Sequence, residues 1–281
     1  MMIVITGATG FVGRETIRLL LESGREVTAV SRDPDQARLP AEARVVTGDP
    51  SDPRSLRSVW EGAEAVLISP RAVGRAAPEL LAAAAAAGVR RTVVISALTV
   101  QYPAGEPRFA DGFRAAEQAA QESGLAWTAL RCADFDANAL AWAPQVRATG
   151  MVRGAYPKAA TSPIHHRDIA AVAASALTDP GHDGRAYVLT GPESLTQLDK
   201  VRILGETLGI DLSFDEVAPE QVRAALLAQG LPEEIPARLL GSLADYAHTP
   251  GPTTDTVAEL LGRPALTFAQ WSAENAAAFQ N

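Results

Sequence analysis

Cysteine, basic charge and long hydrophobic runs are all scarce in this chain of 281 residues. The single cysteine, Cys132, leaves no internal disulfide and excludes a cysteine-rich metal site. Acidic residues outnumber basic ones by 33 to 25, which gives a net charge of −8 and a pI near 5.1. Phosphate groups and anionic membrane surfaces attract basic faces, so this balance argues against a sequence-independent nucleic-acid partner and a membrane partner.

Residues 80–87 form the longest apolar run, far short of the roughly 18 residues that a membrane span needs. The first five residues enter an apolar, strand-like run without the basic leader and cleavage region of a signal peptide. We therefore expect a cytoplasmic protein. The 47% share of hydrophobic residues is enough for a large core, in one large or two small domains.

Short apolar segments alternate with helical patterns along the first two thirds of the chain. Strands are predicted at residues 3–6, 26–31, 44–47, 65–69, 92–96, 127–132 and 186–190. Helices are predicted at residues 14–23, 78–87, 111–123 and 164–178, and again at 194–208, 219–229, 234–246 and 254–261. This alternation indicates a doubly wound parallel sheet of the α/β class, followed by a smaller and mainly helical C-terminal region.

The strongest chemical signal is the turn Gly7-Ala8-Thr9-Gly10-Phe11-Val12-Gly13, between the first predicted strand and helix. Glycines at this spacing permit a sharp turn and close approach of a pyrophosphate to the backbone, while the helix N-terminus offers N–H donors. We expect the cofactor to contact Gly7, Thr9, Gly10, Phe11, Val12 and Gly13. The pattern predicts a dinucleotide-binding Rossmann domain over residues 1–190 and a substrate or lid region over residues 191–281, with part of 133–165 contributing to the substrate cleft.

About 20 residues beyond the glycines, Ser31-Arg32-Asp33 stands where this fold reads the adenosine ribose. An arginine there can hold a 2′-phosphate through charge-assisted hydrogen bonds, whereas an acidic residue would accept from a 2′-hydroxyl. Because Arg32 comes first and Asp33 precedes a proline, NADP(H) is favoured over NAD(H), with Ser31 and Arg32 as contacts. The alternative is that Arg32 is an ordinary solvated arginine.

These residues and several later segments resemble the atypical short-chain dehydrogenase/reductase superfamily, and within it the NmrA-like NAD(P)H-binding proteins and related quinone reductases. The later segments are Gly48-Asp49 with Asp52, and residues 123–131, 135–140, 164–170 and 187–192. The resemblance covers nearly the whole chain. It implies that Asp49 lies by the adenine, and that Ser69 and Pro70 lie along the cofactor. By the same resemblance, Ser96 and Ala97 lie near the nicotinamide.

Members of that superfamily typically carry a Tyr-x-x-x-Lys pair that moves a proton and binds the nicotinamide ribose. The corresponding positions here are Phe109 and Phe113, and neither side chain can transfer a proton. A carbonyl reductase would then need another acid, such as a water or Tyr102 just beyond the fifth strand. Tyr102 is therefore the candidate catalytic residue, with an ordinary loop tyrosine as the alternative.

Several side chains could line an apolar pocket for a flat substrate, although a core role is the alternative for each aromatic. The candidates are Phe109, Phe113, Phe135, Asn138, Trp142 and His165. The adjacent pair His165-His166 has no further ligand cluster, so no metal is expected. Cys132 is interpreted as a small buried group, and the absence of a GxSxG elbow leaves hydrolase chemistry without support.

We expect the partner to be a small molecule of apolar or aromatic character. Three functions of the protein remain open. The first is an NADP(H)-dependent oxidoreductase that passes hydride to a quinone, an enone or a cyclic natural-product intermediate without the usual Tyr/Lys pair. The second is a non-enzymatic NADP(H) sensor of NmrA type. The third is a redox-neutral isomerase or cyclase on the same fold. An oligomer is compatible with all three.

Overall fold

The computed structural model describes residues 1–280, which form two compact units. The first unit contains residues 1–100, 110–132 and 166–189. The second contains residues 101–109, 133–165 and the described residues from 190 onward. Among these described residues, none of the helices is both long and apolar enough to cross a membrane.

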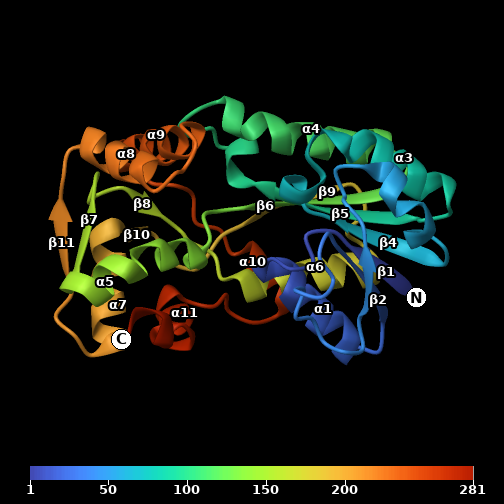
Figure 1. Cartoon of the computed structure of the whole chain (residues 1–281), viewed down its shortest axis with the longest axis horizontal. Coiled ribbons are helices and arrows are strands. Elements are labelled where there is room, and N and C mark those ends of the chain that lie inside the picture. The colour runs from blue at the N-terminus through green and yellow to red at the C-terminus, as the bar shows by residue number, and fades with distance from the viewer. Residues whose placement is uncertain (281) are drawn as a thin grey trace. The chain divides into compact units, whose positions relative to one another are not determined.

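A parallel seven-stranded sheet forms the centre of the first unit (Figure 1). Its strands are β1 Met2–Ile5, β2 Glu26–Ser31, β3 Arg44–Thr47, β4 Ala63–Ile68, β5 Arg91–Ala97, β6 Ala126–Cys132 and β9 Arg185–Leu189. They lie in the order β3-β2-β1-β4-β5-β6-β9, and each neighbouring pair is parallel. The predicted doubly wound architecture is therefore confirmed.

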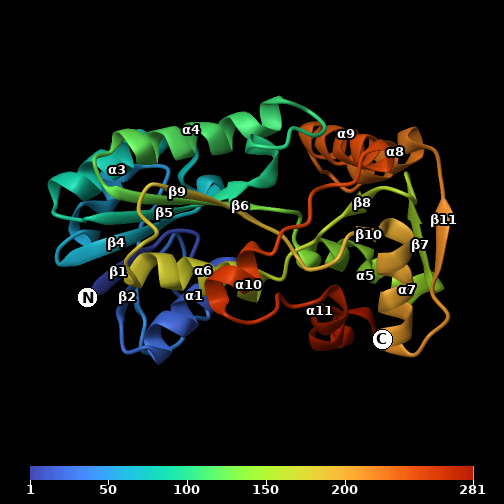
Figure 2. The same ribbon diagram turned by 180° about the vertical axis from the view of Figure 1, so that it is seen from behind.

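Helices cover both faces of this sheet. They are α1 Phe11–Glu22, α2 Pro70–Val73, α3 Ala77–Ala86, α4 Arg108–Glu122 and α6 His166–Thr178, with short 3₁₀ helices at Pro53–Val59, Gly74–Ala76 and Leu98–Val100. Figures 1 and 2 show α3 and α4 along one face and α1 and α6 along the other. This double cover explains why Ile3, Val4 and Ile5 are all fully buried although their side chains alternate between the faces.

The strand order reverses at β1, because β2 follows it on one side and β4 lies on the other. Open parallel sheets bind ligands at such a switch point, outside the carboxyl ends of the strands. The residues that leave β1, β2, β3 and β4 at this edge are Thr6-Gly7, Arg32, Gly48-Asp49 and Ser69. The topology thus gathers four of the sequence-predicted segments at one edge of the sheet.

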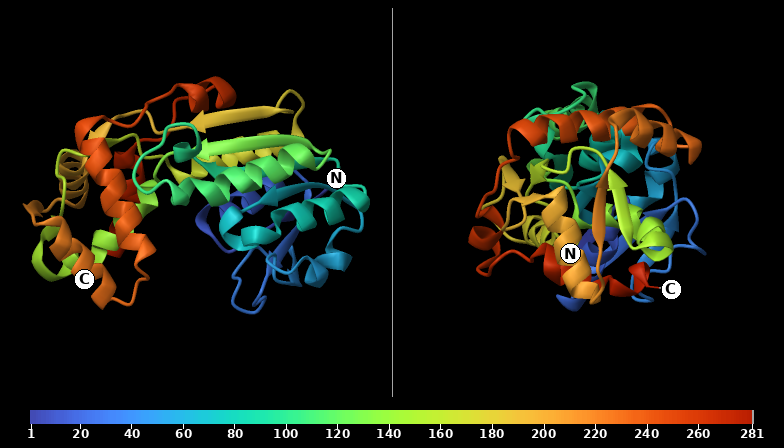
Figure 3. Two further views of the ribbon diagram at one scale, coloured as in Figure 1. Left: turned by 90° about the horizontal axis from the view of Figure 1, so that it is seen from above. Right: turned by 90° about the vertical axis from the view of Figure 1, so that its left-hand side faces the viewer.

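The second unit combines helices with two small sheets. Its helices are α5 Ala143–Thr149, α7 Gln197–Leu208, α8 Pro219–Ala228, α9 Glu234–His248, α10 Thr256–Leu261 and α11 Phe268–Glu274, with 3₁₀ helices at Asp136–Trp142 and Ala276–Phe279. Its strands are β7 Met151–Gly154, β8 Ala160–Thr161, β10 Leu195–Thr196 and β11 Ser213–Glu216. Strand β11 pairs in parallel with β7, as Figure 3 (right) shows, and β10 pairs antiparallel with β8.

An aromatic cluster organises the core of the second unit. The rings of Phe268 and Trp271 stack with centroids 5.5 Å apart, and Phe279 meets Trp271 edge-on. Val201 and Leu204 of α7 pack against them. Capping boxes begin the two helices that meet here, at Thr196 for α7 and at Thr267 for α11, so local sequence fixes where each helix starts.

Candidate cofactor-binding site

The three glycines of the first turn are required for different reasons. Gly7 has a φ of +64°, and a side-chain Cβ built on it would lie 2.7 Å from the Cβ of Ser69. A Cβ on Gly13 would lie 2.3 Å from the carbonyl oxygen of Gly7. A Cβ on Gly10 would meet only that same oxygen, at 3.4 Å, which is ordinary contact. The fold itself therefore demands Gly7 and Gly13, whereas at Gly10 the protein leaves space open.

Gly10 is also the N-cap of α1. Its backbone is extended, with φ −78° and ψ 168°, and it provides no side-chain cap for the helix. The N–H of Gly10 donates to the carbonyl of Gly7 at 3.0 Å, which closes the turn. An uncapped helix N-terminus next to an open glycine is an arrangement that favours an anion such as a pyrophosphate.

A cavity of about 410 Å³ lies beside this turn, entirely within the first unit. Its walls come from the loops after β1, β2 and β3 and from α2 and the residue that follows it, after β4. The lining residues are Gly7, Thr9, Val30, Ser31, Arg32, Asp33, Gln36, Asp49, Pro50, Ser51, Arg71, Ala72 and Gly74. Gly7, Thr9, Ser31, Arg32 and Asp49 were all expected at the cofactor, so the fold brings these five predicted residues to one cavity.

Two arginines and two aspartates make this cavity strongly polar. Arg32 and Arg71 are both exposed and line it together. Hydrogen bonds from the backbone and hydroxyl of Ser51, with a smaller contribution from the nearby charge of Arg32, hold the pKa of Asp49 below its usual range. Asp49 is therefore an acceptor at neutral pH, suited to hydroxyl or amino donors, while the arginines suit an anionic group.

Asp33 stabilises the loop after β2 through local hydrogen bonds. Its N–H and carbonyl both bond the Ser31 hydroxyl, at 3.2 and 2.9 Å, and its carboxylate accepts the N–H of Gln36 at 3.3 Å. These bonds make Asp33 the residue that opens the turn after β2, as expected for an aspartate that precedes a proline. They also fix the start of the segment that presents Arg32.

Arg14, on α1, bridges two of the loops that line the cavity. Its Nε donates to the carbonyl of Thr9 at 2.8 Å, and its Nη1 donates to the carbonyl of Arg38 at 2.7 Å. Arg38 has a φ of +48°, a backbone conformation that is uncommon outside glycine. The guanidinium thus connects the glycine-rich turn to the middle of the loop that carries Arg32.

We expect Arg14→Met to lower NADPH affinity by about fivefold to tenfold, because two hydrogen bonds that hold the cavity walls are lost. Isothermal titration with NADPH measures the change. Arg18→Met is the matched control, since Arg18 lies one turn further along α1 and bonds Glu15 and Glu22 instead. Equal affinities in the two variants would contradict a role for Arg14 in shaping the cavity.

The remaining predicted cofactor contacts in this part of the site are Phe11 and Val12 of the glycine turn and Ser69 and Pro70 after β4. Phe11 is 51% exposed, and its ring lies 5.5 Å from that of His166. Val12 is buried and packs into the fold. Ser69 donates its N–H to the Thr6 hydroxyl at 2.9 Å and is the N-cap of α2, which begins at Pro70.

At the end of β5, Ser96 is 3% exposed and donates to Glu117 at 2.5 Å. Glu117 also receives two N–H groups of Arg131, with contacts of 2.7 and 3.0 Å. This bonding raises the pKa of Arg131, so the group is an ion pair anchored between β5, α4 and β6. The Ser96 hydroxyl is thus committed to a buried network, and Ala97 beside it is buried too.

The predicted substrate residues lie in different environments. Phe113 is half-buried on α4 in the first unit, whereas the others belong to the second. Tyr102 is 41% exposed, on the segment that ends at the half-buried Phe109. Trp142 packs against the aromatic core cluster. This is the core role that was the alternative to lining a pocket.

Three further predicted pocket residues cluster around one short segment of the second unit. Phe135 is half-buried, bridges Ile164 and precedes a 3₁₀ helix on which Asn138 is exposed. His165 is fully buried, with its Nε2 3.3 Å from a carboxylate oxygen of Glu274.

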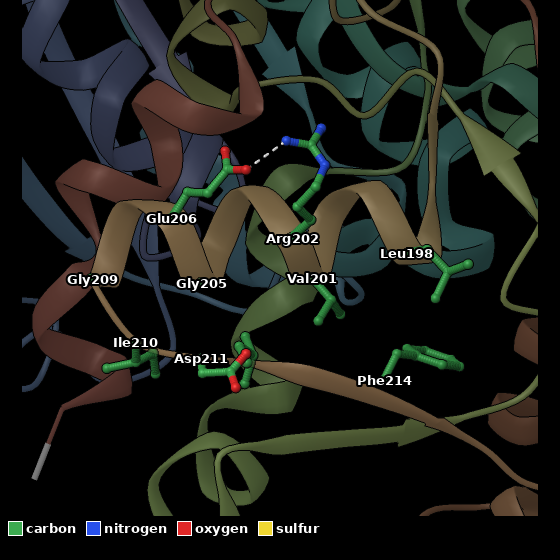
Figure 4. A pocket seen from close by; sticks show the side chains of 10 residues that line it. Leu198, Val201, Arg202, Gly205, Glu206, Gly209, Ile210, Asp211 and Phe214 are labelled. Carbon is green, nitrogen blue, oxygen red and sulfur yellow. Dashed lines mark hydrogen bonds and ion pairs between the residues drawn. The ribbon is translucent and has the colours of Figure 1, made fainter.

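A groove of about 370 Å³ in the second unit involves none of these predicted residues. It lies between α7 and β11, and Leu198, Val201 and Phe214 are among its apolar lining (Figure 4). Arg202 and Glu206 form an ion pair at 2.8 Å along α7.

Cys132 is buried, and burial raises the pKa of its thiol well above the usual range. Because only the thiolate is a strong nucleophile, we expect the native protein to resist 5,5′-dithiobis(2-nitrobenzoate) at pH 8 for hours. One thiol per chain should react at once in 6 M guanidinium chloride. Rapid reaction of the native protein would contradict the buried assignment.

Sequence reasoning missed Arg71, Gln36 and Ser51 among the residues that line the cavity. Arg71 directly follows Ser69-Pro70, so a cation beside the predicted end of β4 was a usable signal. Gln36 and Ser51 are common loop residues, and only the folded loops reveal which way they face.

Comparison with known proteins agrees with this geometry. A family described as NAD(P)H-binding matches residues 7–180. A Streptomyces griseus relative named (4-alkanoyl-5-oxo-2,5-dihydrofuran-3-yl)methyl phosphate reductase is 39% identical over 280 residues, with 99% of each chain covered. An NAD(P)H azoreductase of Xenophilus azovorans is 34% identical, also over 99% of each chain.

Among solved structures, an NADPH-dependent quinone oxidoreductase of Escherichia coli, crystallised with NADPH, superposes with a TM-score of 0.82 at 27% identity. The superposition covers 97% of this chain and 99% of that one. The glycine turn, the cavity beside it and these matches together confirm the expected resemblance. This chain belongs to the NAD(P)H-binding family of Rossmann proteins.

Proposed function

We propose that this protein is an NADPH-dependent reductase that passes hydride to a small, electron-poor organic acceptor, either a quinone or a conjugated carbonyl compound. The observation that carries the proposal is the cavity at the switch point of the sheet. There the glycine turn adjoins the loop that presents Arg32, and Arg71, on α2 directly after β4, lines the same cavity. Arginine is well suited to a ribose 2′-phosphate because its planar donors match the phosphate oxygens.

The names of the relatives support reduction as the reaction. The Streptomyces relative reduces a phosphorylated dihydrofuranone by its name, and the other two are named for azo compounds and quinones. These acceptors share an electron-poor conjugated system. Hydride addition to such a system leaves a delocalised anion that solvent can protonate, so the reaction does not demand a protein acid.

The sequence of α4 fits this chemistry. It carries Phe109 and Phe113 and contains neither tyrosine nor lysine. Bound NADPH supplies two electrons as hydride, and a proton from water completes the reduced product. The chain's own residues bind and orient the cofactor through the glycine turn, Arg32 and Asp49. For an acceptor that needs a proton from the protein, the exposed phenol of Tyr102 is the candidate donor.

Loss of NADPH absorbance at 340 nm tests the proposal, with menadione and 2-cyclohexenone as acceptors. We expect turnover of at least one acceptor that depends on both the protein and NADPH. Tight NADPH binding without oxidation by quinones, enones, imines or aldehydes would overturn the reductase proposal and favour a cofactor sensor or a redox-neutral enzyme.

A further inference from the structure

One face of helix α7 is exposed beside the groove between α7 and β11, and four residues form a ridge along it. Leu198, Arg202, Glu206 and Ile210 follow one another at intervals of four residues, which is about 6 Å along a helix. The two large apolar residues at the ends, Leu198 and Ile210, are 44% and 43% exposed. Arg202 and Glu206 lie side by side between them (Figure 4).

A row with little side-chain volume runs next to this ridge. Val201, Gly205 and Gly209 make up the row, and all three line the groove. A Cβ on Gly209 would have open space around it. Ile210 stays against the last turn of α7, because its N–H donates to the carbonyl of Gly205 at 3.1 Å. The face thus combines a ridge of long side chains with a shallow row, into which the ridge of another helix can pack.

The chemistry along the ridge is complementary to its own reverse order. Arg202 and Glu206 lie two residues on either side of Leu204, and Leu198 and Ile210 lie six residues on either side of it. A two-fold axis at the level of Leu204 would place a second copy antiparallel along the ridge. Arg202 would then meet the partner's Glu206, and Leu198 would meet the partner's Ile210. Each charge faces the opposite charge, each apolar group faces an apolar group, and the symmetry repeats both contacts.

Within one chain, the charged centre of the ridge contributes little. Arg202 and Glu206 form an ion pair at 2.8 Å, but their side chains are 57% and 62% exposed, and water screens such a pair. In the antiparallel arrangement each group gains a second opposite charge and loses part of its water. A different protein would have to supply the same order of apolar, acidic, basic and apolar groups at the same spacing, whereas a second copy carries it by its own sequence.

We propose that this face of α7 binds a second copy of the chain and forms a two-fold symmetric dimer. The partner's ridge of the same four residues packs along the shallow row of α7, beside the groove. Packing of such i±4 rows against each other is the commonest arrangement of helix pairs in globular proteins. The interface uses residues of the second unit alone, and it does not depend on the proposed reductase activity.

Sedimentation velocity over protein concentrations from about 1 to about 200 μM tests the dimer. We expect the wild-type mass to rise with concentration towards twice the 29.5 kDa of one chain. Arg202→Glu and Glu206→Arg each give the centre of the dimer four charges of one sign, so each should raise the Kd of the dimer by about tenfold to a hundredfold. Leu198→Ser should raise it by about tenfold, because its apolar contact is lost twice.

Mixing the two charge variants tests the pairing itself. An equimolar mixture of Arg202→Glu and Glu206→Arg should form a heterodimer, because each charge again faces its opposite. The double variant Arg202→Glu/Glu206→Arg should dimerise with itself, to within about threefold of the wild-type Kd. Arg18→Glu is the matched control, since Arg18 and Glu22 form an exposed pair at the same spacing on α1, and it should leave dimerisation unchanged. Unchanged thermal melting and NADPH affinity establish that the variants are folded.

The same measurements can overturn the dimer. A wild-type protein that stays monomeric at about 200 μM would contradict it, and the face would be left to a small apolar ligand or to another protein. A dimer that survives both single charge reversals would use another surface. Single variants that fail to associate with each other when mixed would contradict the pairing of Arg202 with the partner's Glu206.

Discussion

Gly10→Val should abolish measurable NADPH binding and leave the fold intact. A Cβ at this position meets only the Gly7 carbonyl oxygen, at 3.4 Å, so the protein has room for the new side chain. The extended backbone of Gly10 also suits a β-branched residue. The new methyl groups would instead occupy the space that a pyrophosphate needs in order to approach the backbone N–H groups at the start of α1.

We expect a loss of about 3 kcal/mol or more in binding, which corresponds to at least a hundredfold in Kd. Isothermal titration measures it, and circular dichroism with thermal melting establishes the fold. Gly13→Val is the contrasting variant, because its Cβ would lie 2.3 Å from a backbone oxygen. That variant should be destabilised by about 3 kcal/mol or fail to fold.

The contrast between the two positions makes the assignment testable. Retained NADPH affinity in a folded Gly10→Val protein would contradict a pyrophosphate at this turn. If Gly10→Val instead unfolded like Gly13→Val, Gly10 would be a packing glycine and the open space would have another explanation.

Most of the sheet of the first unit could be predicted from sequence because its inner strands are buried on both faces. Such strands read as short continuous apolar runs, and the prediction at 26–31 matches β2 at both ends. The prediction at 44–47 also matches β3 at both ends, although this edge strand is exposed or half-buried along its length. The glycine turn was equally visible, because its conformational demands restrict the residue type at Gly7 and Gly13.

The second unit was harder to predict because its strands are short. Residues 213–216 and 151–154 pair with each other from distant parts of the chain, and β8 and β10 span two residues each. These short strands show neither a usable alternation nor a continuous apolar run. The expectation of a mainly helical region over residues 191–281 therefore overlooked β10 and β11, and no strand was predicted at β7 and β8. Their pairing is decided by tertiary contacts, such as the packing of α7 beside β11.

Side-chain roles in the substrate region illustrate a second limit. In the sequence, Trp142 and Phe135 are both aromatic candidates for the substrate pocket. In the structure Trp142 packs on the aromatic core around Trp271, while Phe135 lies beside the bridge to Ile164. Likewise, no feature of the sequence near Phe109 predicts its stacking with Arg238, which lies 129 positions later on α9. Apolar character identifies candidates, but only the fold separates packing from recognition.

Arg32→Ala should weaken NADPH binding by roughly tenfold to a hundredfold and change NADH binding by less than about threefold. Only NADPH carries a 2′-phosphate, and a charge-assisted interaction of about 1.5–3 kcal/mol would be lost with that ligand alone. Arg32 is well placed for this role because Ser31, Asp33 and Gln36 fix the loop on which it lies. Its exposure means that removing it leaves no buried partner unsatisfied, so the fold should be unaffected.

Parallel titrations with NADPH and NADH at two salt concentrations measure this selectivity. The wild-type preference for NADPH should shrink as salt rises, because screening weakens an exposed ionic contact. Arg71→Ala provides the comparison, since Arg71 lines the same cavity from α2, which directly follows β4. If Arg32→Ala weakened both cofactors equally while Arg71→Ala weakened only NADPH, then Arg71 would be the residue that reads the 2′-phosphate, and the sequence-based assignment of Arg32 would be wrong.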